Sequence, residues 1–133
     1  MKVALDTNVV VSALATRGLC ADLFHLVLAE HELVLGETVV GEVRRVLSEK
    51  FRIPRSNVEE VESFLRRQAA IVATEAGRSI RGLDAADARV LAEAVAGNVD
   101  VLVTGDRDLL KLRDQPVRIV SPRGLWDLLR RAT

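Results

Sequence analysis

Short apolar runs alternate with longer amphipathic stretches along the chain, a pattern that predicts β-strands separated by α-helices. Residues 99–103 are almost entirely apolar, which is typical of a buried strand in a parallel sheet. The expected strands are residues 3–5, 33–35, 71–73, 99–103 and 117–120. The expected helices are residues 8–15, 19–29, 39–50, 57–70, 85–96 and 124–131. This order predicts an α/β fold, a three-layer α/β/α sandwich with a mostly parallel central sheet.

Composition and charge narrow the class of protein. The length of 133 residues predicts a single domain spanning residues 1–133. Nineteen acidic and nineteen basic residues cancel, which excludes a strongly basic DNA-coating protein. Cys20 is the only cysteine, so no disulfide framework or cysteine metal site is expected. Neither a signal-peptide core nor an apolar run of ~18 residues is seen, so we expect a cytoplasmic protein that does not contact a membrane.

Acidic residues stand directly after two of the expected strands. Asp6 follows residues 3–5, and Asp106 follows residues 99–103. Carboxylates at the carboxyl ends of parallel strands converge over one edge of a sheet. Asp6 also precedes a helix, so helix capping is the alternative interpretation.

Two further acids lie on expected helices. Asp87 falls on the same side of residues 85–96 as Leu91 and Ala94, whereas Glu93 and Arg89 are assigned to the solvent side. Asp84 is the expected N-cap of this helix, and a loose capping box between Asp84 and Asp87 is the alternative to a site role.

Glu42 lies beside the apolar stripe of residues 39–50. Its alternative role is to favour the dipole of that helix, whose expected N-cap is Thr38.

The four acids Asp6, Glu42, Asp87 and Asp106 would repel one another if they met. Each pair about 4 Å apart costs roughly 4 kcal/mol at an effective dielectric of ~20. A divalent cation removes this conflict, and oxygen ligands without histidine or cysteine select Mg²⁺ or Mn²⁺. Asn8 and Thr104 are expected to hold water or orient the carboxylates. Asp108 is either a fifth acid of the site or a surface residue of a short helical turn.

Such a site suits hydrolysis of phosphodiester bonds, because a metal ion activates water and stabilises the leaving oxygen. The chain has no Walker A loop, no Gly-x-Gly-x-x-Gly after its first strand and no Gly-x-Ser-x-Gly elbow. Some arginines on loops or helix faces are expected to border the site and to contact phosphate, the candidates being Arg17, Arg44, Arg45, Arg52 and Arg107.

Four blocks in order resemble the PIN-domain nucleases. They are Leu5-Asp6-Thr7-Asn8-Val9, Glu42 in an early helix, Asp87-Ala88-x-x-Leu91-Ala92-x-Ala94 and Val103-Thr104-Gly105-Asp106-x-Asp108-Leu109. The short chain is similar to VapC-type toxins of toxin–antitoxin pairs. The resemblance implies metal-ligand roles for Asp6, Glu42, Asp87 and Asp106, and accessory roles for Asn8, Thr104 and Asp108. It also implies a Mg²⁺- or Mn²⁺-dependent endoribonuclease that forms a homodimer and often binds a protein antitoxin.

Three functions remain open on the sequence. The leading hypothesis is a metal-dependent ribonuclease that acts as a toxin. The alternatives are an RNA-processing nuclease and a catalytically silent RNA- or protein-binding module on the same fold, since a fold does not fix a function. The intact acidic set favours an enzyme, because a silent module has no need to keep mutually repelling carboxylates.

Overall fold

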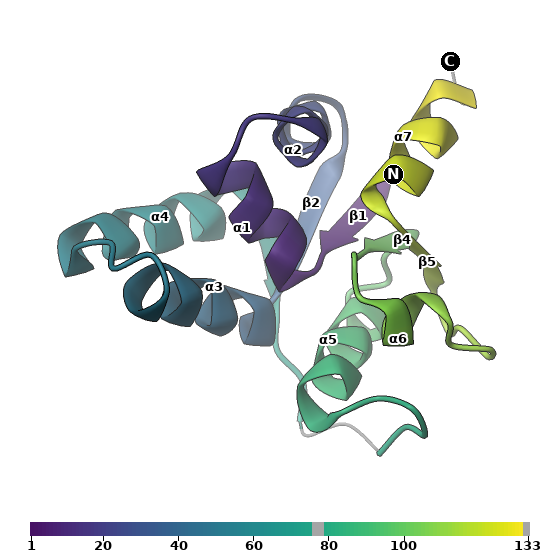
Figure 1. Cartoon of the computed structure of the whole chain (residues 1–133). Helices are drawn as coiled ribbons and strands as arrows, with labels where there is room; N and C mark the ends of the chain where they lie inside the picture. Colours follow the sequence, from purple (N-terminus) through teal and green to yellow (C-terminus); the bar gives the residue numbers. More distant parts are fainter. Residues whose placement is uncertain (76–78, 132–133) are drawn as a thin grey trace.

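A five-stranded parallel sheet forms the centre of the computed structural model, which describes residues 1–75 and 79–131 (Figure 1). The strands are β1 (Lys2–Leu5), β2 (Glu32–Gly36), β3 (Ala70–Val72), β4 (Val101–Val103) and β5 (Arg118–Val120). The helices are α1 (Thr7–Ala15), α2 (Leu19–Glu30), α3 (Glu37–Glu49), α4 (Arg55–Gln68), α5 (Ala85–Ala96), α6 (Arg107–Leu110) and α7 (Pro122–Arg131). The predicted α/β class and parallel sheet are therefore confirmed.

The strand order β3-β2-β1-β4-β5 explains the layers. The chain moves outward from β1 to β3, and then crosses the sheet through α5 to reach β4 on the other side of β1. Because parallel crossovers are right-handed, this change of direction puts α5 on the face opposite α1 and α2. Figure 1 shows helices on both sides of the sheet, with α5 away from α1 and α2.

The reversal of strand order falls between β1 and β4, which pair in parallel with Leu5 opposite Val103. Both strands are buried on each face, with Val3, Val101 and Val103 fully inaccessible. Open α/β sheets bind ligands outside the carboxyl ends of their strands at such a switch point. In this chain the residues that follow β1 and β4 are Asp6 and Thr104.

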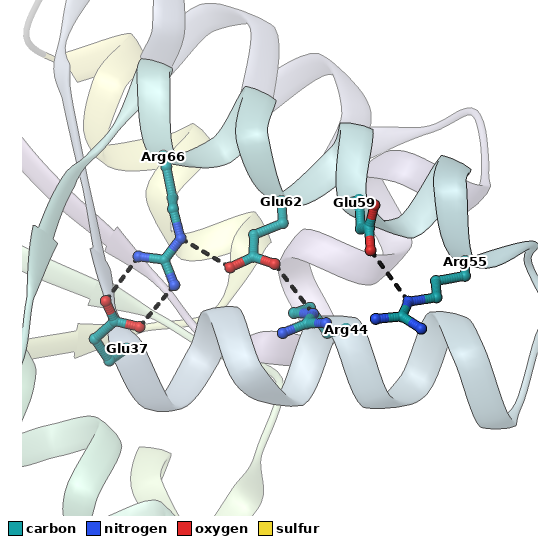
Figure 2. A network of polar contacts seen from close by, with 6 residues as sticks. All are labelled: Glu37, Arg44, Arg55, Glu59, Glu62 and Arg66. Atoms are coloured by element: carbon teal, nitrogen blue, oxygen red, sulfur yellow. Dashed lines mark hydrogen bonds and ion pairs between the residues drawn. The ribbon is translucent and has the colours of Figure 1, made fainter.

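Helices α3 and α4 pack against each other and carry a network of ion pairs between their exposed faces (Figure 2). Arg66 contacts Glu37 with both terminal nitrogens, at 2.7 and 2.9 Å. Glu62 lies between Arg66 at 2.9 Å and Arg44 at 3.1 Å. Each carboxylate of this network therefore has at least one guanidinium partner.

Two predictions, one about the start of α3 and one about the exposed side of α5, are wrong. Thr38 was expected to cap a helix that starts at residue 39, but α3 begins two residues earlier, at Glu37, and its N-cap is Gly36. Glu93 was expected on the solvent side of α5, but only 4% of the residue is exposed. The helical wheel failed there because α5 packs against strands β2 and β3 and also against α3, so its buried face is wider than its apolar stripe.

No single helix within residues 1–75 and 79–131 has the length and apolar character to cross a membrane. Only α1 and α2 taken together, across a bend of 101°, satisfy that criterion.

Candidate acidic site at the switch point of the sheet

Asp6 is held at the end of β1 by hydrogen bonds to both of its carboxylate oxygens. Oδ1 accepts from the backbone N–H of Thr7 at 2.8 Å, and Oδ2 accepts from the hydroxyl of Thr104 at 2.6 Å. The residue is also the N-cap of α1, so the capping interpretation describes part of its role. Only 6% of Asp6 is exposed, and burial raises the pKa of its carboxyl despite these two donors.

Thr104 links Asp6 to Asp106. Its side chain is fully buried at the end of β4, and its hydroxyl oxygen accepts the backbone N–H of Asp106 at 3.0 Å while donating to Asp6. Asp106 caps α6, since its Oδ1 accepts the backbone N–H of Asp108 at 2.8 Å. The charge of Asp106 also contributes to the raised pKa of Asp6. One hydroxyl therefore bonds to Asp6, 98 positions away in the sequence, and to the backbone of Asp106.

Glu42 reaches the same region from α3. Burial is the main cause of its raised pKa, followed by the negative charge of Asp6. The Thr7 hydroxyl lies beside Glu42 and lowers this pKa, but it makes no hydrogen bond of regular geometry with any described residue. Thr7 was not among the expected site residues, and the only signal for it in the sequence is its place next to Asp6.

Asp87 approaches from the first turn of α5. Burial raises the pKa of its carboxyl to about 6, and the charge of Asp106 adds the next largest contribution. Asp84 is the N-cap of α5, and its Oδ1 accepts the backbone N–H of Asp87 at 2.8 Å. The cap is thus Asp84, and no described hydrogen bond runs back from the Asp87 side chain, so the reciprocal capping box is absent within the described residues.

The four acids form one electrostatic group without forming a closed ligand set. Asp6, Glu42 and Asp106 all raise the pKa of Asp87. None of the four makes a salt bridge with a basic side chain of the described chain. However, within residues 1–75 and 79–131 no three acidic, histidine or cysteine side chains are arranged to hold one metal ion. The structure therefore gathers the acids at one edge of the sheet but leaves them apart.

Asn8 and Asp108 lie at the border of this group. Both residues are exposed, Asn8 in the first turn of α1 and Asp108 in α6. Neither side chain makes a hydrogen bond to another described residue, whereas the backbone of Asp108 is bound by Asp106. Their accessory roles stay predictions.

The donor set fits a hard divalent cation. All candidate ligands are oxygen atoms, which Mg²⁺ and Mn²⁺ prefer over sulfur or imidazole. Burial is the main cause of the raised pKa values, and repulsion among the acids adds to it. The buried Thr7 hydroxyl adds a neutral oxygen that no regular hydrogen bond occupies.

A cavity of about 590 Å³ lies between the segment before α5, Leu91 of α5, and the segment that follows α6. Its apolar wall consists of Ile80, Leu91, Leu112 and Pro116, and its charged residues are Arg81, Asp108, Lys111, Arg113 and Asp114. Asp108 is common to the cavity and the border of the acidic group. By contrast, Arg44 and Arg45, two of the arginines expected to contact phosphate, are paired with Glu62 and Glu49.

The chain was compared with families, curated proteins and solved structures. Residues 2–108 match the sequence pattern of a protein family, the PIN domain. No curated protein matches the sequence. The VapBC2 structure from Rickettsia felis, bound to a promoter DNA fragment, shares 16% identity and a TM-score of 0.67 over 91% of this chain and 98% of that one.

Two further structures have the same fold. FitAB bound to an IR36 DNA fragment shares 20% identity, with a TM-score of 0.62 over 90% of this chain and 94% of that one. FitAcB from Neisseria gonorrhoeae shares 16% identity, with a TM-score of 0.59 over 91% and 98% of the two chains. At these identities the likeness concerns the fold, whereas the family match covers most of the sequence. The chain belongs to the PIN-domain family.

Proposed function

We propose that this protein is a divalent-metal-dependent endoribonuclease that hydrolyses phosphodiester bonds of RNA. The observation that carries the proposal is the unpaired acidic group at the switch point of the sheet. The four acids act on one another electrostatically, and three of them have raised pKa values. No basic side chain of the described chain makes a salt bridge with them, although the charge of Arg45 lowers the pKa of Glu42. Such an arrangement costs stability, so it points to a cation and a reaction.

In this proposal Asp6, Glu42, Asp87 and Asp106 hold Mg²⁺ or Mn²⁺ in their deprotonated forms. The bound ion would lower the pKa of a water and stabilise charge on the leaving oxygen. Thr104 keeps the Asp6 carboxylate oriented and ties it to the backbone of Asp106. The backbone N–H of Thr7 holds the other oxygen of Asp6, so the side chain has little freedom to turn away.

The RNA strand would continue from the acidic group into the neighbouring cavity. Lys111, Arg113 and Arg81 supply positive charge there, and none of the three forms a salt bridge with a described acid. The apolar wall offers a surface for an unstacked base. Recognition of bases in this way requires single-stranded RNA, because paired bases are not exposed.

The proposal is tested by incubating purified protein with single-stranded RNA in Mn²⁺, Mg²⁺ or EDTA. The wild type should cleave only with a metal, and Asp6→Asn and Asp106→Asn should each remove cleavage. Glu59→Gln is the matched control, because Glu59 is an acid of α4 that pairs with Arg55 of the same helix and has no role in this proposal. Cleavage that continues in EDTA or in both aspartate variants would overturn the metal-site mechanism.

The solved structures of similar fold include VapBC2 and FitAB, each bound to a DNA fragment. Together with the resemblance of the sequence to VapC-type toxins, this favours a toxin with a protein antitoxin as the biological role. Induced expression of the wild type should then arrest growth, whereas Asp6→Asn should not.

We further propose that the protein is a homodimer and that it acts in the cytoplasm. Light scattering of the purified protein checks the dimer. Growth without arrest, together with RNA cleavage, would favour an RNA-processing nuclease; RNA binding without cleavage would favour a silent binding module.

A further inference from the structure

Helix α3 begins without a cap from its own sequence. Its N-cap is Gly36, which has no side chain to accept a hydrogen bond. The first N–H groups of a helix have no partner within the helix, and an N-cap side chain normally accepts from the second or third of them. In α3 the second helical residue is Thr38.

Glu93 of α5 supplies the missing acceptor. Its two carboxylate oxygens accept the backbone N–H of Thr38 at 3.1 and 3.3 Å. The negative charge also lies at the positive end of the α3 dipole, where it is stabilising. Burial raises the pKa of Glu93, while the hydrogen bonds from Thr38 oppose that rise. A buried carboxylate thus acts between two helices in the way an N-cap side chain acts within one.

The glycine at the N-cap of α3 makes this contact with Glu93 possible. A Cβ placed on Gly36 would stand 2.8 Å from Cδ and 2.9 Å from Cβ of Glu93, which is closer than real contacts of this kind. Gly36 therefore leaves the space that the Glu93 side chain fills. A local cap at position 36 and a distant cap from position 93 exclude each other.

The two helices that Glu93 joins carry two acids of the proposed site. Glu42 is one turn beyond Thr38 on α3, and Asp87 is less than two turns before Glu93 on α5. Because α3 and α5 pack against each other, the contact between these helices sets how far apart the two carboxylates lie.

We propose that Glu93 is a positioning residue, which fixes α3 on α5 through Thr38 and so sets the placement of Glu42 relative to Asp87. This inference rests on the proposed nuclease function for its consequence in catalysis, but the coupling of the helices stands without it. The sharpest alternative is that Glu93 merely stabilises the start of α3.

A rescue experiment separates these two roles. Glu93→Gly removes the acceptor together with the Cβ that would crowd a side chain at position 36, and Gly36→Ser added to it gives α3 a cap of its own in the vacated space. Glu93→Gln keeps an acceptor for Thr38 and serves as the conservative variant. If Glu93 positions α3, the double variant should melt at a higher temperature than Glu93→Gly but should not regain the cleavage rate, with kcat lowered roughly tenfold or more because small misplacements of reacting groups are costly.

Spin labels measure the helix placement directly in metal-free protein without RNA. Labels at Ser48→Cys and Ala96→Cys, two exposed positions on α3 and α5, are introduced in a Cys20→Ser background. The distance distribution should be narrow in the wild type and in Glu93→Gln, and broader or shifted in the double variant even though that variant is stable. An unchanged distribution there would overturn the positioning role. A wild type that does not cleave RNA would defeat the nuclease proposal alone.

Discussion

Two groups of carboxylates in this molecule are treated in opposite ways. In the network between α3 and α4, Glu37 and Glu62 each face a guanidinium, and the hydrogen bonds from Arg66 lower the pKa of Glu37 (Figure 2). At the switch point of the sheet, burial raises the pKa values of Asp6 and Glu42, and the charge of a neighbouring acid adds to each rise. The first group lies on the surface of paired helices, whereas the second lies where strand order reverses.

The difference shows which acids are neutralised by the protein itself and which need a bound cation. A surface ion pair is complete in itself and is worth little, because water screens it. A group of buried, unpaired acids lowers stability, and a chain that retains it must gain something else. The following changes test this contrast, from the largest expected effect to the smallest.

Thr104→Val should have the largest effect on metal binding by the acidic group, which is called the acidic edge below, without changing the shape of the core. The variant removes the donor to Asp6 and the acceptor for the backbone of Asp106. Groups that orient metal ligands typically contribute roughly 10–100-fold to metal affinity or activity. Calorimetric titration with Mn²⁺ measures the loss, and Thr16→Val, which removes an exposed hydroxyl at the end of α1, is the control. Wild-type affinity in Thr104→Val would show that Thr104 plays no orienting role.

Lys111→Ala should weaken RNA binding rather than the chemical step, because Lys111 lines the cavity and is free of a carboxylate partner among the described residues. We expect a higher KM with kcat retained, and a slope of binding against salt concentration that falls by about 1. Lys50→Ala, at the exposed end of α3, is the matched control. Equal changes in KM for the two variants would show that the RNA does not pass through the cavity.

The acidic edge should make stability fall as the pH rises. Asp87 has a pKa of about 6 in the folded state against 3.8 for a free carboxyl, so the folded chain holds more protons between these values. Its contribution to stability is complete below about pH 4 and is lost as the pH passes about 6. Asp87→Asn should flatten this slope in urea unfolding with EDTA between pH 4 and 8. Part of the slope should remain, since Asp6 and Glu42 are shifted in the same direction. An unchanged slope in the variant would contradict the raised pKa.

Arg66→Ala should have the smallest effect. It removes the partner of Glu37 and Glu62, but exposed pairs are worth about 0.2–1 kcal/mol each. Urea unfolding should show a loss in this range, and RNA cleavage should stay at the wild-type rate. A loss of cleavage comparable with that of Thr104→Val would mean that the network between α3 and α4 also governs the acidic edge.

The elements were largely predictable because each strand is a short apolar run and each helix an amphipathic one. The convergence of Asp6 and Asp106 followed from one rule about parallel strands. Glu93 was missed for a physical reason. Its burial depends on the start of α3, where Thr38 lies 55 residues away in the sequence and the N-cap Gly36 leaves room for the Glu93 side chain. The spacing of apolar residues within one helix cannot predict a contact with a segment that only folding brings close.

The hydrogen bond between Thr104 and Asp6 also sets an order of events during synthesis. Strand β1 leaves the ribosome long before β4, and until β4 pairs with it Asp6 has neither the Thr104 hydroxyl nor Asp106 nearby. A growing chain therefore cannot assemble the acidic edge. If the edge cuts RNA, the ribosome that makes this protein is shielded from it until nearly all of the sheet has been translated.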